Sequence, residues 1–377
     1  MFEIDDYIYS SNNTLGRGSF STVYLGENII NQEKIAIKKI SLEKYKSIAI
    51  DIQNEIKILQ KLNHPNIVSL VHRAIKDNQL YIILEYCPLG DLHEFYKEKY
   101  VKEYYVCHYA KQIISGLKYL ATMNIMHRDI KPHNILLKDI YTVKISDFGF
   151  AKKNNNMNLA KTLCGSPIYM APEIMQCKKY SNKTDIWALG ILLYELLFAS
   201  PPFIAQNHFE LMRVINDTTI NYPKHNLISQ ECKNFLNFLL EKNPDYRANH
   251  VDIDEHDWIL KSDPIQKLST SSTYELYNEF IVNPDYQEQN ISSIEETENI
   301  FKFDSESPLN SKHNIEPELE NNIYSKEDIN VYDNSVYEND YIFLEKPVIN
   351  TPTKYSHVSQ TTVLTYSLTD MFGKIIN

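Results

Sequence analysis

The stretch His127-Arg128-Asp129-Ile130-Lys131-Pro132-His133-Asn134, followed after twelve residues by Asp147-Phe148-Gly149, decides the fold and chemistry expected of this chain. The carboxylate of Asp129 can accept the proton of an attacking hydroxyl group. The side-chain oxygens of Asn134 and Asp147 are hard ligands of the kind that Mg²⁺ prefers. A base followed by two magnesium ligands in this order predicts transfer of a phosphoryl group from ATP to a hydroxyl.

Lys131 narrows the expected acceptor. It follows Asp129 by two residues, so its ammonium group can reach the phosphoryl group in transfer and neutralise developing charge. A lysine at this position is typical of transfer to serine or threonine hydroxyls. The plainer interpretation of Asp147 is a turn aspartate before a core phenylalanine, and the accompanying Asn134 argues against it.

A glycine pair near the N-terminus predicts the phosphate-binding part of a nucleotide site. Gly16 and Gly18 lie among strand-forming residues, and a backbone without side chains can approach phosphates closely. Lys38 follows Gly18 by twenty residues, enough to reach the next strand, where it can contact the α and β phosphates. Glu55 shares a helical stripe with Leu59 and is the acid expected to pair with Lys38.

Taken singly, these residues have plainer interpretations. Gly16-x-Gly18 is often just a hairpin turn, Lys38 can be a solvated strand lysine, and Glu55 can be a surface charge on a helix. The catalytic stretch at residues 127–134 favours the nucleotide-binding interpretation of all three.

Hydrophobic periodicity predicts strands first and helices afterwards. The expected strands lie within 10–40, including Ile35 to Lys38, and at 67–71 and 80–85, and the expected helices at 47–62, 104–123 and 183–198. About five strands with one helix, followed by a larger helical part, predict an α+β fold with two lobes and a cleft between them.

The chain is expected to divide into a folded part and an acidic tail. The folded part is expected to cover 7–262, with a small lobe at about 7–86 and a helical lobe at about 88–262. From Ile265 onward, 7 Lys and 19 Asp plus Glu leave a charge of −12, so the first 264 residues carry about +1 of the total of −11. We expect 265–377 to be largely disordered.

Composition excludes several classes of protein. A near-neutral folded part and an acidic tail lack the basic face that nucleic-acid binding requires. The N-terminal ten residues carry no apolar run, and the longest apolar stretch, 186–200, is too short to span a bilayer, so we expect neither signal peptide nor transmembrane segment. Five scattered cysteines without metal-ligand spacing predict a reducing, intracellular compartment.

Together these residues resemble the protein kinase superfamily over roughly 7 to 262. The motifs that carry the resemblance are Gly16-x-Gly18, Lys38, Glu55, His127 to Asn134, Asp147 to Gly149, Ala171-Pro172-Glu173, Asp185-x-Trp187 and Arg247. The resemblance implies the bilobal kinase fold and the cofactors ATP and Mg²⁺. The implied catalytic residues are Asp129, Lys131, Lys38 and Glu55, and the implied metal ligands are Asn134 and Asp147.

The resemblance also implies an adenine pocket. The backbone of Glu85 to Cys87 should bind adenine behind the gatekeeper Leu84, and Asp91 should meet the ribose. The implied nucleotide-binding residues are Leu15, Gly16, Arg17, Gly18, Ser19, Phe20, Ser21, Thr22, Val23, Ala36, Lys38, Leu84, Glu85, Cys87, Asp91 and Leu136. In the helical lobe, Glu173 should pair with Arg247, and Asp185 should brace the catalytic loop.

A finer resemblance is to the autophagy-initiating kinases, the ULK family. It is carried by the segment from Thr162 to Glu173, by Asp147-Phe148-Gly149-Phe150-Ala151, and by Ser21, which stands where the superfamily has a third glycine. Thr162 is the expected activating phosphosite, because Arg128 beside the catalytic aspartate can bind a phosphate there, helped by Lys152. The alternative is that Thr162 is an ordinary loop residue.

His133 bears on the choice of substrate. Kinases that select arginine before the target residue often carry an acid at this position, so the histidine disfavours such a preference. The resemblance implies apolar selection around the target serine or threonine.

The tail contains one segment that resembles a docking motif. Asp340-Tyr341-Ile342-Phe343-Leu344-Glu345 is similar to segments with which ULK-like kinases bind ubiquitin-like autophagy proteins, and it can add as a strand to a sheet edge. An incidental apolar cluster is the alternative. The resemblance implies a cytoplasmic protein recruited to autophagic membranes through a partner. A kinase of another signalling or cell-cycle subfamily, or a pseudokinase scaffold, are the competing hypotheses.

Overall fold

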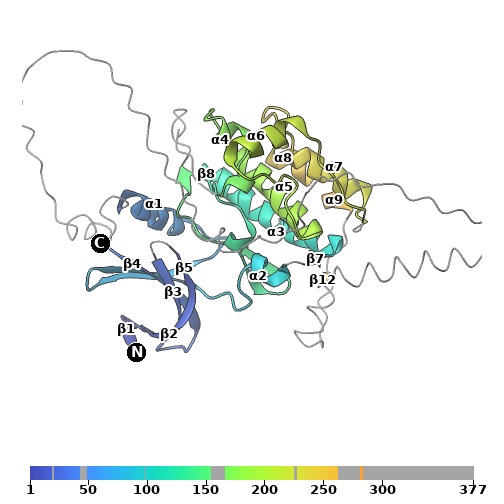
Figure 1. The fold of residues 1–377 in the computed structure, drawn as a ribbon. Coiled ribbons are helices and arrows are strands. Elements are labelled where there is room, and N and C mark those ends of the chain that lie inside the picture. Colours follow the sequence, from blue (N-terminus) through green and yellow to red (C-terminus); the bar gives the residue numbers. More distant parts are fainter. Residues whose placement is uncertain are drawn as a thin grey trace, which may run out of the picture.

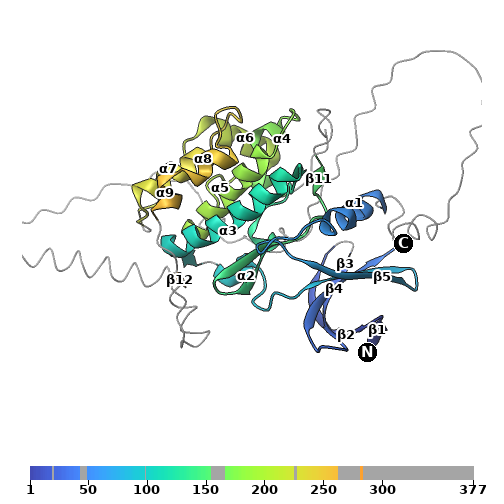
Figure 2. The same ribbon diagram turned by 180° about the vertical axis from the view of Figure 1, so that it is seen from behind.

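The protein has two lobes, and its fold class is α+β, as expected from the sequence (Figures 1 and 2). The computed structural model describes residues 1–18, 21–42, 49–97, 99–153, 166–224, 227–261 and 281–282. Ser19, Phe20, Thr162 and the motif at 340–345 therefore lie outside the described residues, as does nearly all of the predicted tail.

The small lobe is an antiparallel sheet with one helix against it. Its six strands have the order β1-β2-β3-β4-β6-β5. The elements are β1 (Phe2–Ile4), β2 (Tyr7–Arg17), β3 (Ser21–Asn28), β4 (Lys34–Ser41), α1 (Ala49–Leu59), β5 (Leu70–Lys76) and β6 (Gln79–Glu85). Alternation along the strands sends side chains to two separate cores. Ile35 and Ile37 join tyrosines on the outer face, whereas Ile40 and Ile82 pack beneath α1.

The large lobe is mainly helical. Its helices are α2 (Leu92–Tyr96), α3 (Glu103–Thr122), α4 (Pro172–Met175), α5 (Lys183–Phe198), α6 (His208–Asp217), α7 (Gln230–Leu239), α8 (His250–Asp254) and α9 (Asp257–Leu260), with 3-10 turns η1 (Pro132–Asn134) and η2 (Pro167–Tyr169). Its short strands are β7 (Tyr100–Val101), β8 (Ile125–Met126), β9 (Ile135–Asp139), β10 (Thr142–Ile145) and β11 (Lys152–Lys153), and β12 (Ile281–Val282) follows the helices.

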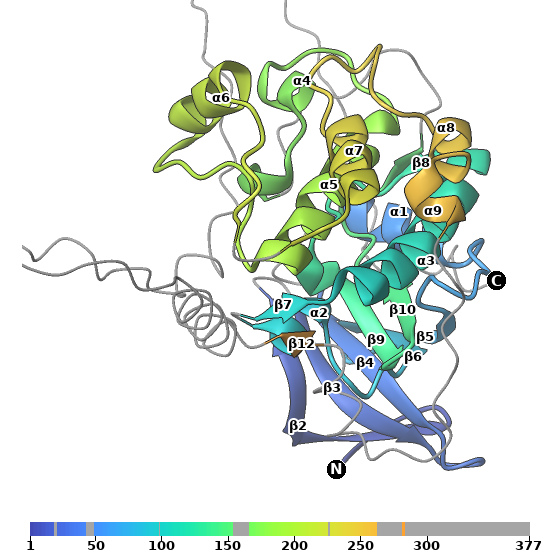
Figure 3. The same cartoon turned by 90° about the vertical axis from the view of Figure 1, so that its right-hand side faces the viewer.

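Local sequence explains where several of these helices begin. Asn207, Ser229 and Asn249 precede α6, α7 and α8, and each side chain accepts a hydrogen bond from a backbone N–H in the first turn. Helix α5 is apolar on almost every side and lies buried at the centre of the lobe, as Figure 3 shows. The hairpin β9–β10 and the turn η1 bring the two halves of the opening motif next to each other.

The sequence-based elements differ from the observed ones in three places. The strand expected at 67–71 is wrong: strand β5 begins at Leu70, and Ile67 forms only an isolated bridge with Ile145 of the large lobe. Strand β1 adds a sixth strand that the polar N-terminus did not suggest. Ile281 and Val282, inside the tail predicted to be disordered, form a strand.

Two further expectations concern the whole chain. None of the helices in the described ranges is long and apolar enough to cross a membrane. Cys87, Cys107, Cys177 and Cys232 are free thiols, and Cys164 lies outside the described residues.

Candidate active site

Lys38 is positioned by the pairing of strands β4 and β6. It lies opposite Ile82, whose buried side chain is in the core beneath α1, so Lys38 points toward α1. Its Nζ lies 2.7 Å from Oε1 of Glu55 and 3.2 Å from Oδ1 of Asp147. Three residues from β4, α1 and the segment after β10 therefore meet at one point between the lobes.

The charges at this point shift one another's pKa values. Burial alone would lower the pKa of Lys38, but the carboxylates of Asp147 and Glu55 outweigh burial and raise it. The charge of Lys38 in turn lowers the pKa of Asp147. Burial raises the pKa of Glu55 in spite of its bond to Lys38. Lys38 is thus held as a cation, the form that can bind phosphate oxygens.

Asp129 lies at the base of the cleft and is 3 % exposed. Its Oδ2 accepts a hydrogen bond from Nδ2 of Asn134 at 2.7 Å and lies 3.0 Å from Nζ of Lys131. Its Oδ1 accepts a hydrogen bond from the backbone N–H of Ser166 at 3.3 Å, and Nζ of Lys131 donates to Oγ of Ser166 at 2.9 Å. The carboxylate is therefore oriented from both sides, as a proton acceptor requires.

A buried carboxylate braces the loop that carries Asp129. The oxygens of Asp185 accept hydrogen bonds from the backbone N–H groups of His127 and Arg128, both at 2.8 Å. Arg128 adopts a left-handed backbone conformation with φ of 68°, and these bonds hold it there. The bracing role that the resemblance gave to Asp185 is thus visible as contacts.

Arg128 directs its guanidinium toward the end of the Asp-Phe-Gly segment. Its Nε donates to the carbonyl of Phe150 at 2.6 Å, and NH1 donates to the hydroxyl of Tyr180 at 3.1 Å. Thr162, its expected phosphate-bearing partner, lies outside the described residues, whereas Lys152 is in β11 and exposed.

The glycine pair leaves room above the cleft. An added Cβ at Gly16 would meet nothing within 4 Å, so the loop at this point presents bare backbone. The backbone N–H of Gly18 bonds to the carbonyl of Ser21 at 2.9 Å, which closes the turn across the two undescribed residues. Leu15, Arg17, Thr22 and Val23 flank this turn in β2 and β3.

The residues expected around adenine come from both lobes. Ala36 lies opposite Leu84 in neighbouring strands, and Leu136 forms a bridge with Asp91. Burial raises the pKa of the Cys87 thiol to about 11, so it stays protonated. Asp91 also caps α2, since its Oδ1 accepts a hydrogen bond from the N–H of Glu94.

The side chains of Asn134 and Asp147 fit a magnesium site. Asn134 bonds to the backbone and side chain of Asp129 through its Nδ2 alone, which leaves Oδ1 able to bind a cation. Asp147 accepts hydrogen bonds from Lys38 and Gly149 at Oδ1. No cluster of three His, Cys, Asp or Glu ligands occurs among the described residues, and Mg²⁺ that is bound with nucleotide takes most of its ligands from phosphate and water.

Glu173 and Arg247 form the ion pair implied by the resemblance. The two guanidinium nitrogens of Arg247 bind the two carboxylate oxygens of Glu173 at 2.7 and 2.9 Å. Both side chains are buried, so the pair ties helix α4 to the end of the helical lobe.

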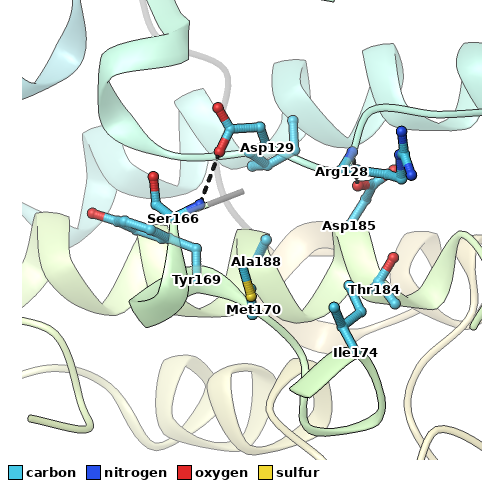
Figure 4. Close-up of a pocket in the computed structure, with 10 residues that line it drawn as sticks. Arg128, Asp129, Ser166, Tyr169, Met170, Ile174, Thr184, Asp185 and Ala188 are labelled. Atoms are coloured by element: carbon cyan, nitrogen blue, oxygen red, sulfur yellow. Dashed lines mark hydrogen bonds between the residues drawn. The ribbon is translucent and has the colours of Figure 1, made fainter. Parts of the chain in front are cut away.

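A small pocket lies between the catalytic loop, the segment from Ser166 and helix α5 (Figure 4). Figure 4 shows Ser166 beside Asp129, with the backbone N–H of Ser166 donating to the Asp129 carboxylate. The residues that line it are Arg128, Asp129, Ile130, Ser166, Tyr169, Met170, Ile174, Thr184, Asp185 and Ala188.

Two site residues were not expected from the sequence. Ser166 lies in the segment from Thr162 to Glu173 but had no role assigned to it, and it contacts both Asp129 and Lys131. His93 stacks on His133 with ring centroids 4.0 Å apart, and no motif had pointed to it. Both contacts join parts of the chain that are distant in sequence, so the spacing of residues along the chain could not predict them.

Comparison with known proteins agrees with this geometry. Residues 9–259 match the family described as "Protein kinase domain". The chain is 36 % identical over 306 residues to the serine/threonine-protein kinase atg1 of Aspergillus oryzae, covering 67 % of this chain and 33 % of that relative. It is 33 % identical over 307 residues to ATG1b of Arabidopsis thaliana, covering 79 % and 43 %.

A third relative is ATG1 of Kluyveromyces lactis, 37 % identical over 294 residues, with 65 % of this chain and 35 % of that protein covered. The chain thus spans less than half the length of each of these relatives.

Proposed function

The chain belongs to the protein kinase domain family, and from this premise we propose that it is an ATP-dependent serine/threonine protein kinase. Its relatives bear that name. The oxygen of the acceptor serine or threonine hydroxyl bonds to the γ-phosphorus, while the bond from the γ-phosphorus to the β–γ bridging oxygen breaks. Asp129 accepts the proton that the hydroxyl loses. Lys131 neutralises charge on the transferred group, and Lys38, fixed by Glu55, holds the α and β phosphates.

The chain supplies side chains that would hold magnesium and a backbone that would hold the nucleotide. Asn134 and Asp147 are the residues that would hold Mg²⁺, which, when bound, offsets the charge of the phosphates. The bare backbone at Gly16 and Gly18 binds the phosphates. Ala36, Leu84 and the backbone that leads to Cys87 contact the adenine.

The observation that carries this proposal is the buried Asp129 carboxylate held between Asn134 and Lys131. The test is phosphate transfer from labelled ATP to protein and peptide acceptors. Asp129→Asn should lower kcat by at least about 10³-fold, since it removes the proton acceptor and keeps the shape. Asp217→Asn, at an exposed ion pair on α6, is the matched control and should retain activity. Equal activity of both variants would exclude the proposed role.

A pseudokinase scaffold is the competing class of function. Such a scaffold is marked by loss of the lysine, the catalytic aspartate or the metal ligands, and this chain has Lys38, Asp129, Asn134 and Asp147. The assay above separates the two classes directly.

Within the kinases, an autophagy-initiating role is the best supported, and another signalling or cell-cycle subfamily is the rival. The support is similarity to relatives named atg1, together with the segment from Thr162 to Glu173. We expect a cytoplasmic protein that a partner recruits to autophagic membranes. The tail motif Asp340 to Leu344 would supply that contact by strand addition.

The tail motif is tested by pull-down with a ubiquitin-like autophagy protein. Tyr341→Ala combined with Leu344→Ala should abolish retention of the full chain, because both pocket-filling side chains are lost. The matched control is Tyr355→Ala with Val358→Ala, which alters a similar pair without an acid directly before it. Retention of the first variant at the wild-type level would end the proposal.

Activation through Thr162 is a separate proposal. A phosphate there can bind Arg128, whose guanidinium already contacts Phe150 and so links the phosphate to the Asp-Phe-Gly segment. Thr162→Ala should lower kcat at least tenfold while circular dichroism and melting temperature stay unchanged. Wild-type activity of the unphosphorylatable chain would contradict it.

Substrate selection is proposed to be apolar around the target residue. His133 and His93 form a stacked aromatic surface next to the catalytic loop, where arginine-selecting kinases carry an acid. A peptide array dominated by upstream arginine would refute this preference.

A further inference from the structure

A short strand from beyond the helical lobe returns to it. Ile281 and Val282 form β12, which pairs antiparallel with β7, so that Ile281 lies opposite Val101 and Val282 opposite Tyr100. Figure 3 shows the orange strand β12 directly beside β7, near α2 and the start of α3. The family match ends at residue 259, so this contact lies outside the recognised domain.

The sequence explains why this part of the tail forms a strand. Phe280-Ile281-Val282 is an apolar, strand-favouring triplet in a region otherwise rich in Ser, Asn, Glu and Tyr. Asn283-Pro284 follows it, and proline cannot donate to a strand ladder.

The receiving strand is held firmly by the large lobe. Val101 is completely buried, and β7 packs against α5, the central helix. Helix α3 begins two residues later at Glu103, whose side chain accepts hydrogen bonds from Ser229 and from Nε1 of Trp258. An extended segment that pairs with β7 therefore meets a fixed edge.

The chain leaves the helical lobe close to this edge. Helix α9 ends at Leu260, and Trp258 within it bonds to Glu103 at 2.8 Å. Residues 261–280 then separate α9 from β12. The entropy cost of closing a loop rises only with the logarithm of its length, so a short pairing can retain such a segment.

We propose that β7 is a docking site for the chain's own segment around Ile281 and Val282, which adds to it as a strand in cis. The kinase unit then extends about twenty residues past the family match. The distal tail starts from the corner of β7 and α2 instead of from α9. A partner bound to the tail is then tethered through β12, which lies near α2 (Figure 3), the helix that packs against η1 of the catalytic loop. This inference does not depend on phosphotransfer activity.

Hydrogen exchange of the full-length chain tests the docking. The amides of residues 100–101 should exchange at least about tenfold faster in Ile281→Pro than in wild type, because proline removes a donor and the strand geometry. The melting temperature should fall by about 2–4 °C, the shift expected when one such contact is lost from a domain of this size. Ile291→Pro, elsewhere in the tail, is the matched control and should change neither quantity.

A free peptide provides a direct binding test. A synthetic peptide of residues 276–288, added to the Ile281→Pro chain, should restore slow exchange at 100–101, whereas the same peptide with proline at 281 should not. Unchanged exchange in the Ile281→Pro chain, or no effect of the wild-type peptide, would overturn the proposal. Protection that rises with protein concentration, together with dimers in sedimentation, would replace it by strand exchange between two copies.

Discussion

At the scale of single residues, the buried charges of the large lobe all have partners that match their geometry. Asp185 accepts hydrogen bonds from two backbone N–H groups, and Asp129 accepts hydrogen bonds from Asn134 and Ser166. A charge in a dry interior is tolerated only when such bonds replace water. Removing one partner is therefore costly, whereas removing an exposed partner is not.

Arg247→Met tests this difference. The change leaves the Glu173 carboxylate buried without its two charged hydrogen bonds, and the free energy of unfolding should fall by about 3–5 kcal/mol. Urea denaturation measures the loss. Lys261→Met, which breaks the exposed pairs with Asp257 and Glu231, is the control and should leave the free energy of unfolding almost unchanged. Similar losses in both variants would contradict the argument.

At the scale of elements, the contact between α2 and η1 shapes the catalytic loop from the side. His93 of α2 stacks on His133 of η1, whose side chain is otherwise exposed, and the partial loss of water under the stacked ring, followed by the charges of His93 and Lys131, lowers the pKa of His133 to about 4. An unfolded histidine has a pKa near 6.5, so between about pH 4 and 6.5 the unfolded chain binds more protons at this residue. His133 therefore makes the protein less stable as the pH falls through that window.

His133→Gln should flatten this pH dependence. The free energy of unfolding should decrease less between pH 7.5 and 5 than it does in wild type, because glutamine does not titrate. Urea denaturation at several pH values measures the slope. His208→Gln on α6 should keep the wild-type slope. An identical slope for His133→Gln would show that the stacked pair does not control the acid response.

At the scale of the whole molecule, the two lobes share a hydrophobic core and are also joined by polar contacts beside the active site. Lys38 of the small lobe bonds to Asp147, and Ile67 of the small lobe forms a bridge with Ile145 of the large lobe beside it. A ligand that binds on both sides of this cleft stabilises the folded state of both lobes at once.

Magnesium ATP should therefore raise the melting temperature. At a hundredfold excess over its Kd the stabilisation is about 2.7 kcal/mol, which corresponds to roughly 5–10 °C for a domain of this size. Thermal shift with and without EDTA measures it, and EDTA should remove most of the effect because Asn134 and Asp147 then lack the cation. Lys38→Met should also lose the shift. An equal shift in EDTA would argue against the two metal ligands.

Sequence alone determined what depends on neighbours along the chain. The order of residues from His127 to Asn134 carries its chemistry in a single loop. A long apolar run located helix α5, because the length of such a run is a local property of the sequence. The strand expected at 67–71 was displaced because its position depends on pairing with β6 and on the bridge to Ile145.

Only the tertiary structure decided which distant residues meet. Ser166 at the Asp129 carboxylate, His93 on His133, and β12 on β7 each join segments that no spacing rule connects. The physical reason is that such contacts form when the packed lobes close the loops between them. Their geometry is therefore set by the whole core and not by the residues that touch.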